Sequence, residues 1–237
     1  MACPALTTLV AYSGVAQPAK RRGAPITTPA QRRQRNREQT KADILKAARA
    51  VMREEGVAAL NLQEVARRVG MRAPSLYEYF ASKAALYDAL FVLGTRLYAR
   101  RVAKLNWDPD RVWDSMAEKM QDYVGFAQEC PELYNLVFER HVPGFTPSEA
   151  AMDEASRLLA GGHQKFELAM ERGALAPGTS AQSAFDLFIA IMHGIASQHL
   201  ANEPNLPVGS GRFGSLVSTA IAVLRAAWAP QPVTSRA

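Results

Sequence analysis

The sequence has little cysteine. Its two cysteines, Cys3 and Cys130, are too few for the disulfide framework that stabilises small secreted domains. A chain of 237 residues can instead bury a large apolar core. The cysteine content therefore predicts a reducing environment, and we expect a cytoplasmic protein.

Long apolar runs are also missing. A membrane-spanning helix needs roughly 18 consecutive apolar residues, but the apolar segment 185–200 contains Asp186, His193 and His199. Residues 1–19 are mildly apolar, but the basic residues follow this run at positions 20–22, whereas a signal peptide carries its positive charge in front. The sequence therefore predicts no membrane partner.

The residue types that catalysis and metal binding need are scarce. No two of the four histidines have the i, i+4 spacing that places two metal ligands on one helix face, and neither cysteine lies in a metal-type cluster. No strand pattern precedes a glycine-rich, phosphate-binding loop. We expect no catalytic activity, no metal and no cofactor.

Positive charge is concentrated in the N-terminal part of the chain. Residues 1–104 carry 19 lysines and arginines against 7 acidic residues, a net charge of +12, whereas residues 105–237 carry 9 against 15, a net charge of −6. Charge runs are often only solvated surfaces, but a basic segment of this size is also typical of proteins that bind a polyanion. The charge alone leaves both interpretations open.

Apolar residues recur at helical spacing along most of the chain, and no alternating run is long enough for a strand, so the predicted fold is all-α. A first helix is predicted over residues 38–55, with Ile44, Leu45, Ala48, Val51 and Met52 on its buried face. A long helix is predicted over residues 83–104, with Leu86, Leu90, Leu93 and Leu97 buried. Further helices are predicted over residues 112–128, 131–138, 148–172, 181–200 and 212–228, with a kink at Gly161-Gly162.

The same pattern divides the chain. Residues 1–36 are rich in proline, threonine, glutamine and arginine and lack periodicity, which predicts a flexible basic arm. We expect a three-helix domain over residues 37–82, a larger helical domain over residues 83–230 and a disordered tail over residues 231–237.

Residues 60–80 hold two short helical patterns on either side of a glycine turn. In the first pattern Asn61 occupies the N-cap position and Glu64 is placed to complete a capping box, and Gly70 has the backbone freedom that ends the helix. The second helix is predicted over residues 73–80, with Leu76 and Phe80 facing inward. Its outward face carries Arg72, Ser75, Tyr77 and Tyr79, which can donate hydrogen bonds to phosphates or base edges, as in a helix-turn-helix.

This segment resembles the DNA-binding domain of the tetracycline-repressor (TetR) family of bacterial transcription regulators. The resemblance rests on residues 65–70 (VARRVG), on residues 75–80 (SLYEYF), and on Ser82, Lys83 and Leu86, and it covers residues 38–97. Arg72 departs from the family pattern, in which a serine usually caps the recognition helix, and Asn61 stands where threonine is common. A weaker resemblance, at residues 126–134 and 191–194, extends into the C-terminal domain.

The resemblance implies roles for individual residues. Tyr77, Tyr79 and Lys83 match phosphate-binding positions, and Ala73, Pro74 and Ser75 match positions that contact bases. We add Gln63 and Arg72, because glutamine can bind adenine and arginine can bind guanine, although either can also stop at a phosphate. The alternatives are a Tyr77 ring packed in the core and a Lys83 that is only solvated. With Asn61, these residues form the predicted DNA-binding set.

The basic residues in front of the first helix have two interpretations. Arg32, Arg33, Arg35 and Arg37 either reach an adjacent minor groove, as the N-terminal arms of other DNA-binding folds do, or add only nonspecific charge. Both interpretations predict a higher affinity for DNA and a steeper salt dependence.

The resemblance further implies a transcriptional regulator. Most members of the family are repressors that a ligand releases from DNA. A small apolar ligand is then expected in the second domain, lined by Met120, Tyr123, Phe138, Phe166, Met170 and His193. His193 either orients the ligand or is a hydrogen-bonded core residue. The alternative function is an architectural or constitutive DNA-binding protein without a ligand, but a segment as long as residues 105–237 exceeds what dimerisation alone needs.

Two apolar stripes predict a homodimer. One is formed by Leu187, Ile191 and Ile195, and the other by Leu216, Ile221, Leu224 and Trp228. Two copies of these helices can close a four-helix bundle. The two-fold axis of such a dimer predicts a roughly palindromic double-stranded DNA operator.

Overall fold

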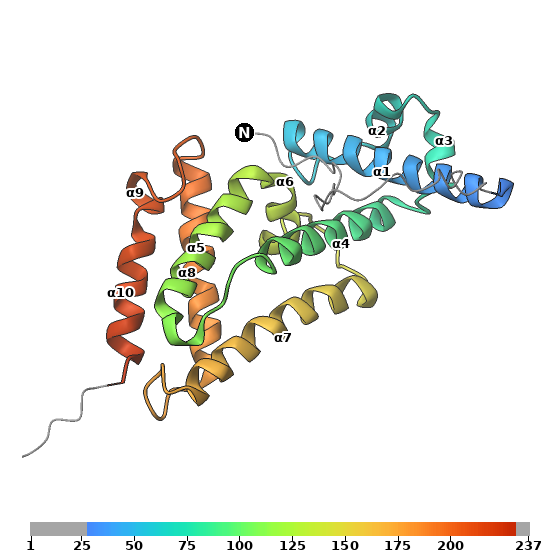
Figure 1. Ribbon diagram of the computed structural model, residues 1–237. Helices are drawn as coiled ribbons and strands as arrows, with labels where there is room; N and C mark the ends of the chain where they lie inside the picture. Colours follow the sequence, from blue (N-terminus) through green and yellow to red (C-terminus); the bar gives the residue numbers. More distant parts are fainter. Residues whose placement is uncertain (1–27, 231–237) are drawn as a thin grey trace, which may run out of the picture.

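The structure is a computed structural model that describes residues 28–230, and all regular secondary structure in that range is helical. Helices α1 (Pro29–Glu55), α2 (Leu62–Val69) and α3 (Ala73–Leu76) form the N-terminal domain, and α4 (Lys83–Val102) runs from it into the C-terminal domain (Figure 1). The C-terminal domain contains α5 (Val112–Glu129), α6 (Pro131–Tyr134), α7 (Glu149–Glu171), α8 (Ala181–Asn202), α9 (Gly211–Gly214) and α10 (Leu216–Trp228). The all-α prediction is confirmed.

The first helix begins earlier than predicted. Thr28 caps it by accepting a hydrogen bond from the Gln31 backbone N–H (3.2 Å), while the Gln31 side chain accepts one from the Thr28 N–H (2.9 Å), and Pro29 occupies the first turn. The flexible arm predicted over residues 1–36 is therefore wrong for residues 29–36, and its remainder lies outside the described residues, as does the predicted tail. Periodicity missed this segment because residues 29–36 are exposed on every side.

Helix α2 begins and ends where the sequence predicts. The Asn61 side chain accepts a hydrogen bond from the Gln63 N–H (2.9 Å), and Gly70 ends the helix in the left-handed conformation with φ of 76°. The predicted capping box does not form, because the Glu64 carboxylate binds Arg67 and Arg68 instead, each at 2.7 Å. The turn that orients α3 is therefore set by Gly70.

Helix α3 is shorter than predicted. It covers four residues, Ala73–Leu76, and then gives way to tight turns in which the N–H groups of residues 77–79 bind the carbonyls three positions earlier. Arg72 makes no side-chain cap, as expected where a serine is missing. Leu76 and Phe80 are buried as predicted, so the outward face of the segment is fixed despite the short helix.

Helix α4 belongs to both domains. Its first half buries Leu86 and Leu90 among residues of α1 and α2, and its second half buries Tyr98 among residues of α5 and α8. Leu93 and Leu97, predicted to be buried, are only half-buried. Phe91 and Gly94 are buried in their place, because α4 turns these positions toward the segment that follows α6, where Val137 lies against Gly94.

The C-terminal helices lie close to their predicted bounds, with two differences. The segment 131–138 divides into α6 and a π-helical turn (Asn135–Glu139), and the last helix divides at Ser215 into α9 and α10. Helix α7 is one continuous helix that includes Gly161 and Gly162. A Cβ on Gly162 would lie 2.6 Å from the Phe185 ring, so this glycine permits α8 to approach α7 closely.

Candidate DNA interface and cavity of the C-terminal domain

The predicted DNA-binding residues gather at one end of the molecule, where α2, α3 and the start of α4 lie along α1 (Figure 1). Six of the nine are exposed, namely Asn61, Gln63, Arg72, Pro74, Tyr77 and Lys83, and the other three, Ala73, Ser75 and Tyr79, are partly exposed. Every residue of the set is therefore at least partly exposed to solvent.

The two tyrosines of this surface are held differently. Tyr77 is 51% exposed, so its ring does not pack in the domain core. Tyr79 is partly covered by Arg37, whose guanidinium lies 5.2 Å from the ring centroid. Arg37 also donates a hydrogen bond to the Glu78 carbonyl (2.7 Å). Arg37 was expected in front of the first helix, but it lies within α1 and binds the end of the recognition segment.

One acidic residue of this surface, Glu64, is bound within the domain, whereas Glu78 is exposed and forms no ion pair within residues 28–230. Glu64 accepts hydrogen bonds from Arg67 and Arg68, which hold its pKa at about 2. Arg68 also pairs with Glu54 of α1 (2.7 Å). In contrast, Arg72 and Lys83 form no ion pair with any residue in the range 28–230. Their charges remain available for phosphates.

A buried carboxylate joins the two domains. Glu132 of α6 is 2% exposed, and its oxygens make four contacts of 2.7–2.9 Å with the guanidinium nitrogens of Arg49 and Arg53 on α1. Arg53 also donates to the Glu129 carbonyl (3.0 Å). This interdomain ion-pair cluster, Arg49, Arg53 and Glu132, fixes α1 against the C-terminal domain. The sequence analysis did not identify it.

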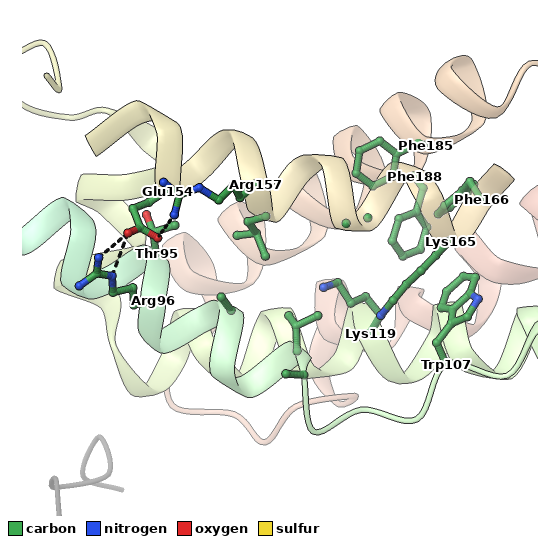
Figure 2. A pocket seen from close by; sticks show the side chains of 16 residues that line it. Thr95, Arg96, Trp107, Lys119, Glu154, Arg157, Lys165, Phe166, Phe185 and Phe188 are labelled. Atoms are coloured by element: carbon green, nitrogen blue, oxygen red, sulfur yellow. Dashed lines mark hydrogen bonds and ion pairs between the residues drawn. The ribbon is translucent and has the colours of Figure 1, made fainter. Parts of the chain in front are cut away.

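The C-terminal domain contains a cavity of about 310 Å³ between α4, α5, α7 and α8 (Figure 2). Arg96, Glu154 and Arg157 lie at one end, where Glu154 pairs with both arginines. Aromatic rings line the other end, and two lysines lie between the ends. The aromatic residues are Trp107, Phe166, Phe185 and Phe188.

Two further charged residues, Lys119 of α5 and Lys165 of α7, line the middle of the cavity, and we call them the lysine pair. Burial lowers the pKa of Lys119 to about 7, with a further contribution from the nearby charge of Lys165. Burial also lowers the pKa of Lys165. Neither forms an ion pair within residues 28–230, although their ammonium groups lie 4.9 Å from the Tyr98 ring and 5.6 Å from the Trp107 ring.

The six predicted ligand-binding residues do not gather around this cavity, and Phe166 is the one that lines it. Met120 is fully buried, and Met170 packs against the same core. Tyr123 and Phe138 belong to an aromatic cluster beside the cavity. His193 is partly exposed, and its two ring nitrogens lie 2.9 Å from the Tyr123 hydroxyl and 3.2 Å from a Glu139 oxygen. The expected set therefore needs revision.

Further structural features bear on the other predictions. Within residues 28–230, no helix has the length and apolar character that crossing a bilayer requires. In the same range, no three His, Cys, Asp or Glu residues cluster as metal ligands would. 

Comparison with known proteins agrees with this architecture. The family profile "Bacterial regulatory proteins, tetR family" matches residues 44–90, and "Tetracyclin repressor-like, C-terminal domain" matches residues 116–224. The HTH-type transcriptional regulator SrpR of Pseudomonas putida is 23% identical over 188 residues, which span 76% of this chain and 86% of SrpR.

Two solved structures illustrate the shared fold. A Rhodococcus sp. RHA1 protein of unknown function superposes with a TM-score of 0.66 at 22% identity, covering 80% of this chain and 95% of its own. Bacillus subtilis FadR in complex with stearoyl-CoA superposes with a TM-score of 0.59 at 14% identity, covering 77% and 96% of the two chains. The family is one of DNA-binding regulators and not of enzymes, in agreement with the scarcity of catalytic residue types. The chain belongs to the tetracycline-repressor (TetR) family of transcriptional regulators.

Proposed function

We propose that the protein is a homodimeric repressor that a small ligand releases from a roughly palindromic operator. The observation that carries this proposal is the course of α4. One continuous helix begins at Lys83 on the candidate DNA interface and forms a wall of the cavity with Thr95, Ala99 and Val102. A ligand that displaces α4 therefore moves a DNA-contacting residue.

The proposed DNA contacts follow from exposure and charge. Lys83, Tyr77 and Tyr79 bind phosphates, and Arg72, Gln63 and the start of α3 lie where base edges are read. Asn61 caps α2 and its place at the surface permits a further phosphate contact. Arg32, Arg33 and Arg35, exposed on the first turns of α1, extend the positive surface toward the flanking DNA.

The proposed ligand site is the cavity beside α4. Its aromatic end is apolar enough for a small organic molecule, and the C-terminal domain is larger than dimerisation requires. Bacillus subtilis FadR, which shares the fold, was solved with stearoyl-CoA bound. A coupling of about 3 kcal/mol, within the usual range for allosteric proteins, would change operator affinity on the order of a hundredfold.

The proposed dimer interface is formed by α8 and α10. Leu187, Leu216 and Val223 are 46%, 41% and 60% exposed, and a second copy would cover them. Ile195, Ile221 and Leu224, which the sequence analysis placed in the same stripes, belong instead to the core of the protomer. Helix α10 lies at the opposite side of the molecule from α2 and α3, so the dimer leaves both DNA-binding surfaces free (Figure 1).

The proposed function includes a cytoplasmic location. Selection of duplexes from a random pool tests whether the protein binds a specific DNA sequence. We expect enrichment of a sequence with two-fold symmetry, and repression of a reporter gene placed behind it. Recovery of no enriched sequence at any salt concentration would refute sequence-specific binding. Enrichment with activation of the reporter would refute repression.

A thermal-shift screen followed by operator titration tests the ligand side. We expect at least one compound that raises the unfolding temperature and weakens operator binding. If every stabilising compound leaves operator affinity unchanged, the ligand-independent alternative replaces this proposal.

A further inference from the structure

The lysine pair places two like charges close together in a partly buried cavity, and no contact within residues 28–230 compensates both charges. Lys119 and Lys165 enter from α5 and α7, and Figure 2 shows their side chains converging between the polar and the aromatic end. Like charges at such close quarters repel, and each ammonium is also partly desolvated. Both effects disfavour the charged pair in the absence of an anion.

The acidic residues near the pair are bound elsewhere. Asp122, whose charge favours protonation of Lys119, binds Arg101 through Oδ1 at 2.5 Å, and its buried Oδ2 has no hydrogen-bond partner within residues 28–230, so Asp122 is not bound to Lys119. Glu154, at the polar end, is bound by Arg96 and Arg157. The Tyr98 and Trp107 rings offset part of the cost through cation–π contacts. An aromatic face supplies no hydrogen-bond acceptor, so neither ammonium group has a protein acceptor within residues 28–230.

A third donor on the cavity wall is also unmatched. Thr95 is 1% exposed, it lines the cavity, and its hydroxyl has no hydrogen-bond partner within residues 28–230. Buried hydroxyls in folded proteins nearly always have a partner. Figure 2 places Thr95 at the polar end of the cavity, beside Arg96 and Glu154, so its hydroxyl is a separate unmatched group. An anion between the two lysines would match their ammonium groups.

We propose that this cavity binds an amphipathic organic carboxylate, whose anionic group lies between Lys119 and Lys165 and whose apolar body lies against Phe166, Phe185 and Phe188. This inference rests on the proposed ligand site and specifies the chemistry of the ligand. Organic cations are excluded by repulsion from the same pair. Neutral analogues bind more weakly, because they leave the buried charges uncompensated.

The size of the cavity narrows the class further. Its volume of about 310 Å³ lies at the lower end of the roughly 300–1,000 Å³ typical of ligand sites. A short-chain or aromatic acid fits this space. Gly162 leaves room for the Phe185 ring at the cavity wall, because a Cβ at this position would lie 2.6 Å from the ring.

Three probes of similar shape test the proposal on the full chain: naphthoate, naphthamide and naphthylmethylamine, which are anionic, neutral and cationic. Calorimetric titration is done on the wild type, Lys119→Met and Lys165→Met. Lys104→Met is the matched control, because Lys104 is exposed just beyond α4 and does not line the cavity. Thermal unfolding of each variant confirms that it folds.

We expect naphthoate to bind the wild type at least about tenfold more tightly than naphthamide, a difference of about 1.4 kcal/mol. Both lysine variants lose this preference, while Lys104→Met keeps it. Equal affinity for acid and amide, tighter binding of the amine, a preference that survives in both lysine variants, or no binding of naphthoate each overturns the proposal.

Operator titration separates this inference from the proposed function. In one outcome, naphthoate binds through the lysine pair and leaves operator affinity unchanged. This result supports a carboxylate ligand and refutes ligand-controlled release of the operator. If a neutral compound releases the operator equally from the wild type and from Lys119→Met, ligand-controlled release is supported. The same result refutes the proposal that the ligand is a carboxylate bound by the lysine pair.

Discussion

Replacing Glu132 by alanine should destabilise the protein far more than replacing any exposed acidic residue. The carboxylate is 2% exposed and accepts from both Arg49 and Arg53, which belong to the other domain. Alanine removes the acceptor and retains two partly buried positive charges. The outcome therefore depends on how much water can replace the lost contacts.

The magnitude follows from the exposure of the two partners. Removing one member of a fully buried ion pair costs about 3–5 kcal/mol. The Arg49 and Arg53 side chains are 20% and 40% exposed, so hydration recovers part of this loss and we expect about 2–3 kcal/mol. At roughly 2–4 °C per kcal/mol for a chain of this size, the melting temperature should fall by about 4–12 °C.

Thermal unfolding followed by circular dichroism measures this change. Glu118→Ala is the control, because Glu118 is exposed on the same domain in α5, and we expect its melting temperature to stay within about 1–2 °C of the wild type. A double-mutant cycle with Arg53→Ala should give a coupling energy of about 1 kcal/mol or more. Equal shifts for Glu132→Ala and Glu118→Ala would show that the cluster contributes nothing to the connection between the domains.

Further predictions concern DNA, dimerisation and the cavity. Lys83→Ala should weaken binding to all duplexes alike and reduce by about 1 the slope of log affinity against log salt concentration. Arg72→Ala should instead change which sequence a random-pool selection enriches. The same effect in both variants would contradict the assigned roles. Val223→Asp should give a folded monomer by light scattering, because Val223 is 60% exposed, whereas Leu224→Asp, at 1% exposure, should unfold the protomer; a dimeric Val223→Asp refutes the interface. Gly162→Ala should push the Phe185 ring into the cavity and weaken ligand binding without changing operator affinity, as paired titrations would show. Because the pKa of Lys119 is about 7, the lysine is protonated below this pH and neutral above it; Lys165 on α7 disfavours its charge and Asp122 on α5 favours it. Carboxylate affinity should therefore fall as pH rises above about 7, by at most about tenfold per unit, and calorimetry on the wild type and Lys119→Met should show this dependence only in the wild type.

The N-terminal domain could be predicted well because its signals are local. Asn61, Gly70 and the spacing of Leu76 and Phe80 each act within a few residues, and the structure agrees at all four. Glu64 was assigned wrongly because the neighbouring arginines compete for its carboxylate. The early start of α1 could have been predicted, because Thr28 and Gln31 have the spacing of a capping box. Hydrophobic periodicity does not indicate it, because the first turns of this helix are exposed on every side.

The cavity could not be predicted from side-chain size. Methionine and phenylalanine fill cores and line cavities alike, and Met120 was placed in the wrong group for this reason. The more useful signal was Lys119, which lies three residues after Met116 and four before Tyr123, on the buried face of α5. A charged residue on an apolar face indicates either a buried partner or a ligand, and only the packing of four helices shows which.

The dimer stripes show a similar limit. Helix α10 is apolar around most of its circumference, so periodicity does not tell which face packs on its own protomer. Neighbouring residues on a helix point about 100° apart, which separates exposed Val223 from buried Leu224. The helix and its role in the proposed dimer were predictable, whereas the contacting residues depend on how α10 packs against α5 and α8.

The most direct test of ligand-controlled release is a titration of the selected operator by fluorescence anisotropy, with and without each compound that raises the melting temperature. Gly162→Ala identifies the compounds that bind the cavity, because they lose their stabilising effect in this variant. We expect these compounds to weaken operator binding at least about tenfold, a change of about 1.4 kcal/mol. Operator affinity that stays constant while the cavity is saturated would contradict ligand-controlled release.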